Sequence, residues 1–311
     1  MRLVLSGAYA LAGLLAALIL APGAAGAEEP RPPAAGGAHA EAAAPPLVLE
    51  GRAIEGGLMI GRTSARAKVW LDGRPVRVSK QGVYLLGFPR DAGREARLEV
   101  QFPDGRTATR LLRVEQRAYE IERIDGLPER KVTPSPEDLR RIAAERARID
   151  KARARFTAES LFESGFIWPL TGRISGVYGS VRVLNGKPRA PHLGLDIVAP
   201  KGTTVVAPAD GVVSLAHRGM FFSGNVVVID HGLGLSSVYA HLERLLVKEA
   251  DHVAQGAPIG TVGATGRVTG PHLHWGVHLF ALGLDPELLV RSMPGAASGA
   301  AGGDESTPGK P

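Results

Sequence analysis

The stretch 272–277 reads His-Leu-His-Trp-Gly-Val, and its pattern bears on both the fold and the chemistry of this chain. Side chains alternate between the two faces of a β-strand, so His272 and His274 would project from the same face. Their Cα atoms would then lie about 6–7 Å apart, because a strand rises ~3.3 Å per residue. That separation suits two metal ligands, or one ligand and one residue that assists the site without binding the metal. The stretch therefore predicts a strand that presents a pair of imidazoles.

The chain on both sides of this stretch also reads as β-structure, from residue 166 to about residue 291. Short apolar and β-branched runs alternate with Gly, Pro, Asn and Asp, which are typical of turns. The run Val226–Ile229 is apolar at every position, which predicts a central strand that is buried on both faces. The other expected strands are 205–206, 211–215, 237–239 and 273–277.

Two further candidate ligands, His192 and Asp196, lie upstream in the sequence His-Leu-Gly-Leu-Asp. Positions i and i+4 meet on a helix, whereas on a straight strand they lie about 13 Å apart. Neighbouring prolines oppose a helix, but a bend at Gly194 could still bring both side chains to one ion. With the pair at 272–274 they supply a His/Asp/His set, which matches a catalytic zinc site with three protein ligands and one open position. From the residues alone, either histidine of the pair could be the third ligand.

The other histidines and the lack of cysteine narrow the chemistry. The chain has nine His and no Cys, so a metal would take imidazole and carboxylate ligands. No His-Glu-x-x-His motif occurs, so no glutamate in helical register would serve as a base, and histidines would handle protons. The remaining histidines outside the Tyr-Ala-His-Leu run at 239–242 are expected to be structural or incidental: His39, His217, His231, His252 and His278.

Region 167–286 resembles the lysostaphin-like zinc metalloendopeptidases, which cut bacterial peptidoglycan. Six blocks in the order expected for that family carry the resemblance: Arg173–Gly179, His192–Ile197, Pro208–Val213, Gly224–Gly232, Tyr239–Leu242 and Gly263–Trp275. The resemblance implies an antiparallel β-sheet peptidase domain. It also implies that one Zn²⁺ ion is bound by His192, Asp196 and His274. The catalytic residues that it implies are His241 and His272, which would orient the water, transfer protons and stabilise the oxyanion.

The implied function is zinc-dependent hydrolysis of peptide cross-links in peptidoglycan, with metal-activated water attacking the scissile carbonyl. The alternative is a non-enzymatic cell-wall regulator that activates an amidase, because some relatives have lost their ligands. All five key positions are intact here, which favours the enzyme. The chain departs from many relatives at Gly276, where they carry an acidic residue, and we expect Ser180–Ala190 to be a loop that borders the substrate groove.

Residues 1–27 are typical of a signal peptide. A basic Arg2 precedes an apolar stretch, and Ala25-Gly26-Ala27 is a small-x-small site, which predicts cleavage after Ala27. An uncleaved anchor is the alternative, because the apolar stretch nearly reaches spanning length. We therefore expect an exported protein of the periplasm or cell envelope. Without cysteine it would have no disulfides.

The rest of the chain divides by composition. Residues 28–46 are rich in Pro, Ala and Gly and read as a flexible linker, and residues 292–311 as a disordered tail. Between them, residues 47–125 predict a small immunoglobulin-like β-sandwich, with a hairpin signal at Asp72-Gly73. We expect this β domain to be a spacer; the alternative is a module that binds a cell-envelope protein partner or a glycan. Residues 166–291 would be the zinc metallopeptidase domain.

A linker and a basic helix are expected over residues 126–165. Ser135 is a suitable N-cap and Pro136 suits the first helical position. The arginine-rich face of this helix could dock on an anionic surface or simply be solvated between the domains. The whole chain has a formal net charge of +6, which favours anionic surroundings. Given the resemblance, we expect peptidoglycan as the partner and no nucleic acid.

Overall fold

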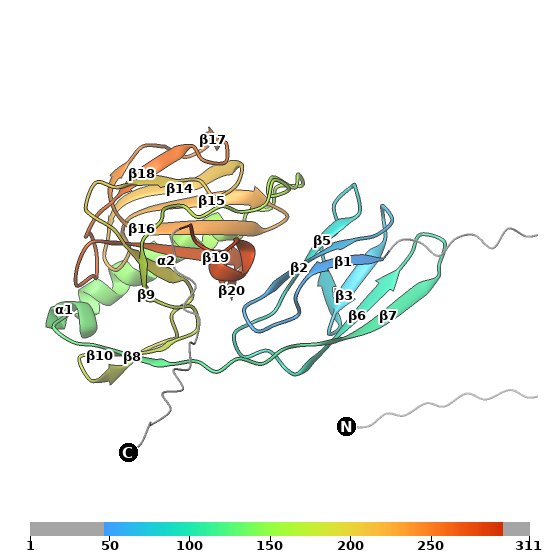
Figure 1. Ribbon diagram of the computed structural model, residues 1–311, viewed down its shortest axis with the longest axis horizontal. Helices are drawn as coiled ribbons and strands as arrows, with labels where there is room; N and C mark the ends of the chain where they lie inside the picture. The colour runs from blue at the N-terminus through green and yellow to red at the C-terminus, as the bar shows by residue number, and fades with distance from the viewer. Residues whose placement is uncertain (1–46, 295–311) are drawn as a thin grey trace, which may run out of the picture. The chain divides into compact units, whose positions relative to one another are not determined.

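The computed structural model describes residues 47–294, which fold mainly as antiparallel β-sheets with one long helix (Figure 1). The predicted signal peptide, the linker 28–46 and most of the predicted tail lie outside the described residues. Within the described part, no helix combines the length and the hydropathy that a bilayer span requires.

The N-terminal β region consists of two antiparallel sheets, with strand orders β1-β2-β5 and β4-β3-β6-β7. Both sheets contribute to one buried cluster that includes Val69, Tyr84 and Leu98. The expected hairpin is confirmed, because Asp72 and Gly73 join β3 to β4 with φ of 50° and 73°. The immunoglobulin-like assignment remains a prediction. The strands are β1 (Val48–Gly51), β2 (Leu58–Arg62), β3 (Lys68–Leu71), β4 (Arg74–Val76), β5 (Val83–Gly87), β6 (Glu95–Gln101) and β7 (Thr107–Arg113).

A small third sheet follows. Strand β8 (Ile121–Ile124) pairs in parallel with β10 (Val181–Leu184), which in turn pairs with β11 (Lys187–Pro188). The segment expected to be a loop before His192 is therefore a hairpin. Its turn is Asn185-Gly186, with φ of 46° and 75°, the conformation that an Asn-Gly turn favours.

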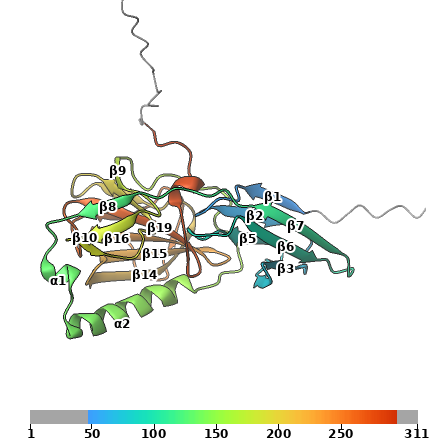
Figure 2. The same cartoon turned by 90° about the horizontal axis from the view of Figure 1, so that it is seen from below.

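The predicted helix is α2 (Pro136–Arg153), preceded by the short α1 (Glu129–Val132). The predicted cap is confirmed, because the Ser135 side chain accepts a hydrogen bond from the Asp138 N–H at 3.2 Å. The helix packs through Ile149 and Ala152 on a face of β14 (Gly211–Met220) and β15 (Gly224–Gly232) (Figure 2). Leu139, near the start of the helix, is 54% exposed, so the apolar side chains of the helix are buried mainly near its C-terminal end.

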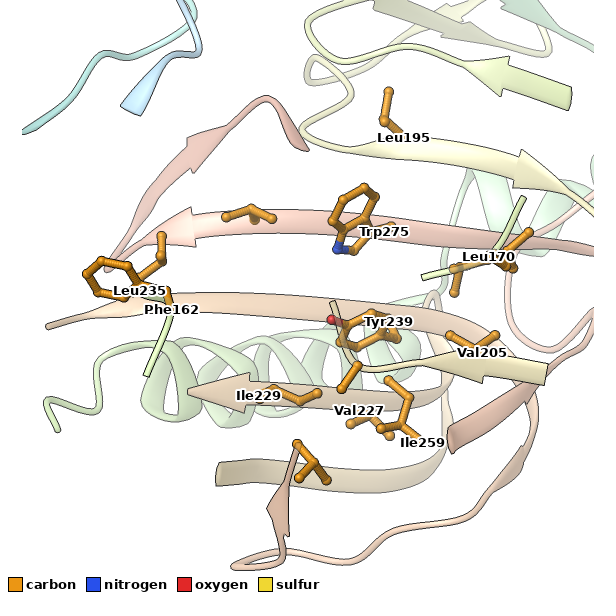
Figure 3. Packing of buried hydrophobic residues seen from close by; sticks show 14 of the residues in the cluster. Phe162, Leu170, Leu195, Val205, Val227, Ile229, Leu235, Tyr239, Ile259 and Trp275 are labelled. Atoms are coloured by element: carbon orange, nitrogen blue, oxygen red, sulfur yellow. The ribbon is translucent and has the colours of Figure 1, made fainter. Parts of the chain in front are cut away.

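The C-terminal region is built on a large sheet with the main order β17-β14-β15-β16-β19-β12-β9. The run Val226–Ile229 lies in β15 with no exposed surface, which confirms its predicted central place. Tyr239 and Trp275 pair on neighbouring strands and pack with residues of β13 and β18 (Figure 3). The elements are β9 (Arg173–Gly176), β12 (Leu195–Val198), β13 (Thr204–Val206), β14 (Gly211–Met220), β15 (Gly224–Gly232), β16 (Leu235–Leu245), β17 (His252–Val253), β18 (Pro258–Val262), β19 (His272–Leu279), β20 (Leu282–Leu284) and η1 (Pro286–Leu289).

Candidate metal centre

Strand alternation on β19 positions the predicted histidine pair. Leu273, Trp275 and Val277 have no exposed surface and belong to the main core. The histidines at 272 and 274 have the opposite parity, so they line the cavity on the other face. Both predicted imidazoles therefore lie on one face of the sheet.

Asp196 reaches His274 from the adjacent strand. Strands β12 and β19 are antiparallel, and Asp196 stands directly opposite His274 in the register. Facing residues of an antiparallel pair have Cβ atoms about 4.5–5.5 Å apart, close enough for their side chains to meet. The Asp196 Oδ1 lies 2.9 Å from the His274 Nδ1.

His192 arrives from the segment that leads into β12. Strand β12 begins at Leu195, and a Cβ on Gly194 would lie 2.7 Å from the His274 Cε1, so only glycine fits at this bend. His192 Nε2 lies 3.1 Å from Asp196 Oδ1 and 2.9 Å from His274 Nδ1. The bend brings together two residues that a straight strand would hold about 13 Å apart.

These three side chains fit a zinc-type ion. Their ligand atoms all lie within 4.8 Å of one another, and no other residue of the described range 47–294 joins such a group. Bonds of about 2.0–2.1 Å at tetrahedral angles would set the donor atoms roughly 3.3 Å apart, close to the observed separations. The His192 Nδ1–H faces the Val177 carbonyl at 3.1 Å, which leaves the Nε2 lone pair for an ion.

The carboxylate of Asp196 uses its two oxygens differently. Oδ1 faces the two imidazoles, whereas Oδ2 accepts a hydrogen bond from Arg182. Burial alone would raise the pKa of Asp196, but the hydrogen bonds and charges of His192 and His274 outweigh it and hold the pKa well below its usual range. The carboxylate is therefore ionised, as a ligand must be.

Arg182 is itself fixed by Glu122. Its Nε donates to Glu122 Oε2 at 3.1 Å, and Glu122 Oε1 accepts from the Val177 N–H at 3.1 Å. A continuous set of hydrogen bonds thus runs from β8 through β10 to the candidate ligand. Neither residue is predicted from the sequence, because their role depends on the pairing of β8 with a strand far along the chain.

The two predicted catalytic histidines stand beside this group. Each has its Nδ1 near a backbone carbonyl, His241 at 2.8 Å from Thr265 and His272 at 2.9 Å from Gly270. If Nδ1 donates there, Nε2 is left for the cavity. Their ring centroids are 4.9 Å apart, and His272 Nε2 lies 4.0 Å from Asp196 Oδ1.

His241 is held in an unusual state. Its φ of 65° is in the left-handed region, which non-glycine residues rarely adopt and which is found at functional sites. Burial, with smaller effects of His272 and His274, lowers the pKa of His241 to about 3. At neutral pH its imidazole is therefore uncharged.

All five side chains line one cavity of about 1000 Å³. The hairpin β10–β11 borders it, as expected for segment 180–190, and so do residues just before and within α1. Arg182, Arg189 and Arg267 also line its wall. The cavity is large enough for a peptide segment.

Residues 190–286 match the model of peptidase family M23, so this part of the chain is an M23 peptidase domain. The resemblance to lysostaphin-like peptidases is thereby confirmed. The chain is 45% identical over 105 residues to peptidoglycan DD-endopeptidase ShyA of Vibrio cholerae, a match that covers 34% of this chain and 22% of ShyA. It thus spans about a fifth of that relative's length.

Two solved structures are similar to the chain. A provisionally assigned M23 peptidase from Pseudomonas aeruginosa has a TM-score of 0.58 and 29% identity, covering 76% of this chain and 95% of that one. The catalytic domain of lysostaphin from Staphylococcus simulans has a TM-score of 0.34 and 30% identity, covering 37% of this chain and 89% of that one.

Proposed function

We propose that this protein is a zinc-dependent endopeptidase that hydrolyses peptide cross-links of bacterial peptidoglycan. The observation that carries the proposal is the convergence of His192, Asp196 and His274 within 4.8 Å, inside an M23 domain. A relative that is named a peptidoglycan DD-endopeptidase supports the substrate. Since that substrate surrounds the cell, we place the protein in the periplasm or cell envelope.

The three ligands would hold Zn²⁺, which when bound lowers the pKa of a water molecule and polarises a carbonyl group. Proton transfer and stabilisation of the developing charge fall to two histidine side chains of the protein. His241, whose Nδ1 lies 2.8 Å from the Thr265 carbonyl, directs Nε2 into the cavity, where it accepts a proton from the attacking water and returns it to the leaving amine. His272, whose Nδ1–H faces the Gly270 carbonyl, directs Nε2 into the cavity; in its protonated form it donates from Nε2 to the oxygen of the reacting carbonyl and stabilises the developing negative charge. The intact set of five favours this enzyme over a regulator that activates an amidase.

The test is digestion of defined cross-linked muropeptides by the zinc-loaded protein, with products identified by mass spectrometry. The variant His274→Ala should bind zinc at least 100-fold more weakly and lose cleavage, because it removes one of three ligands. His252→Ala is the matched control, since that histidine is exposed on β17. Full zinc content and full cleavage by His274→Ala would refute the proposal.

A further inference from the structure

Arg267 is an unusual cation on the cavity wall. It lies in the loop between β18 and β19 and is half-buried. Its guanidinium carbon lies 4.2 Å from the centroid of the Phe222 ring, and its backbone N–H donates to the Phe222 carbonyl at 2.9 Å. Within residues 47–294 its side chain has no hydrogen bond and no ion pair. The ring therefore positions a guanidinium whose N–H groups remain available.

The other charged residues of the wall do not neutralise it. Among the described lining residues the only carboxylate is Asp196, which already pairs with Arg182. Lys187 pairs with Glu129 at 2.8 Å. Arg189 donates only to the backbone carbonyls of residues 132 and 188. In the described part of the chain, the guanidinium groups of Arg189 and Arg267 thus form no ion pair within 4.0 Å of a carboxylate.

Keeping these cations together is unfavourable in the free protein. Burial, followed by the charges of Arg182 and Arg189, lowers the pKa of Arg267 to about 10, so it stays protonated at neutral pH but is destabilised. Zinc in the adjacent site would add further positive charge. An anionic group of the substrate would relieve this repulsion, and a planar guanidinium is suited to bind a carboxylate through two parallel N–H···O bonds.

We propose that Arg267, assisted by Arg189, binds a free carboxylate of the substrate's stem peptide and so selects cross-links with such a group beside the scissile bond. The inference rests on the proposed function, since peptidoglycan cross-links join peptides that end in, or branch with, free carboxylates. A substrate that is neutral around the scissile bond gains nothing from these two arginines.

The experiment compares two synthetic cross-linked peptides that differ only in one group, a free carboxylate or its carboxamide, next to the cleaved bond. The wild-type protein should cleave the carboxylate peptide roughly 10- to 100-fold better in kcat/KM, mostly through KM, the effect expected for a charge-assisted hydrogen-bonded pair. Arg267→Gln should lose this preference, because kcat/KM falls more on the carboxylate peptide than on the carboxamide. Arg267→Lys, which keeps the charge but not the planar fork, should retain part of it.

Arg244→Gln is the matched control, because Arg244 is exposed on β16, outside the cavity lining. Arg189→Gln, which should weaken the preference in the same direction, serves if Arg267→Gln fails to fold in a thermal melt. Equal cleavage of both peptides by the wild type, or an equal loss on both in Arg267→Gln, overturns the carboxylate site and leaves the peptidase standing. Cleavage of neither peptide by the zinc-loaded wild type refutes the proposed function and the inference with it.

Discussion

Among individual residues, His231 is a buried histidine whose pKa is lowered by the fold. The sequence predicts a structural role for it. It is fully buried, with Nδ1 2.7 Å from the Asp210 carbonyl and Nε2 2.7 Å from Ser237 Oγ. Burial lowers its pKa to about 4, against about 6.5 in an unfolded chain. As the pH falls from about 6.5 to about 4, His231 binds a proton in the unfolded state but not in the folded state. The free energy of unfolding therefore decreases over this window and is unaffected by His231 above it.

The substitution His231→Asn should make this acid destabilisation shallower, although the variant is less stable at neutral pH. The slope of unfolding free energy against pH should fall by up to about 1.4 kcal/mol per pH unit, the value for one proton. It should not vanish, because burial also lowers the pKa values of His241 and His278 to about 3. Urea unfolding of metal-free protein between pH 7 and pH 4.5 measures it, with the exposed His252→Asn as control. An unchanged slope in His231→Asn would contradict this account.

At the scale of single elements, strand β8 holds a candidate ligand in place through two side chains. Glu122 on β8 fixes Arg182 on β10, and Arg182 donates to the outer oxygen of Asp196. Hydrogen-bonded partners of this kind typically account for 10- to 100-fold in metal affinity. Glu122 is the better residue to substitute as a test of this support. Substitution of Arg182 would also remove a positive charge that repels the ion.

We expect Glu122→Gln to weaken zinc affinity by about 10-fold, since Arg182 is then held less firmly and is less neutralised. Competition with a chromophoric chelator gives the affinity without reference to activity. Arg123→Gln, next along the same strand and exposed, should bind zinc like the wild type. Identical affinities for the two variants would show that β8 does not support the site.

Local patterns in the sequence predict elements better than they predict how a site is assembled. Alternation along 272–277 was sufficient to place two histidines on one face, because the buried partners at 273, 275 and 277 share the other parity. The Asn185-Gly186 pair also predicts a hairpin turn, although Ser180–Ala190 was expected to be a loop. By contrast, spacing could not show that His192 meets Asp196, which depends on the close approach at Gly194. Nor does any local pattern predict the left-handed φ of His241.

On the scale of the whole molecule, the features missing from the sequence analysis are contacts between distant segments. The parallel pairing of β8 with β10 and the arginines that gather around the cavity are formed by residues far apart in the chain. Periodicity reports which face of an element is buried but not which element covers it. The six ordered blocks nevertheless indicated the family and the five candidate residues. This was possible because a resemblance to a family also implies how that family arranges distant segments of the chain.

The N-terminal β region shares its core with the peptidase region. Leu58, Val83 and Leu85 belong to the same buried cluster as Leu235 and Leu284, and all lie in one compact unit of the chain. Arg117 adds an ion pair at 2.7 Å to Asp285, which is 1% exposed. Loss of this region would therefore expose apolar surface and leave a buried carboxylate unpaired.

Deletion of residues 47–117 should lower the thermal midpoint and promote aggregation, while zinc affinity changes by less than roughly threefold because no candidate ligand is removed. Arg117→Gln, which removes only the ion pair, should cost about 1–3 kcal/mol of unfolding free energy. If the region is a spacer, the folded fraction of the deletion variant should sediment with purified sacculi as the full chain does. Reduced sedimentation at equal folded concentration would instead make the region a binding module. An unchanged melting temperature would contradict the shared core, because the apolar contacts of Leu58, Val83 and Leu85 would then contribute nothing to stability.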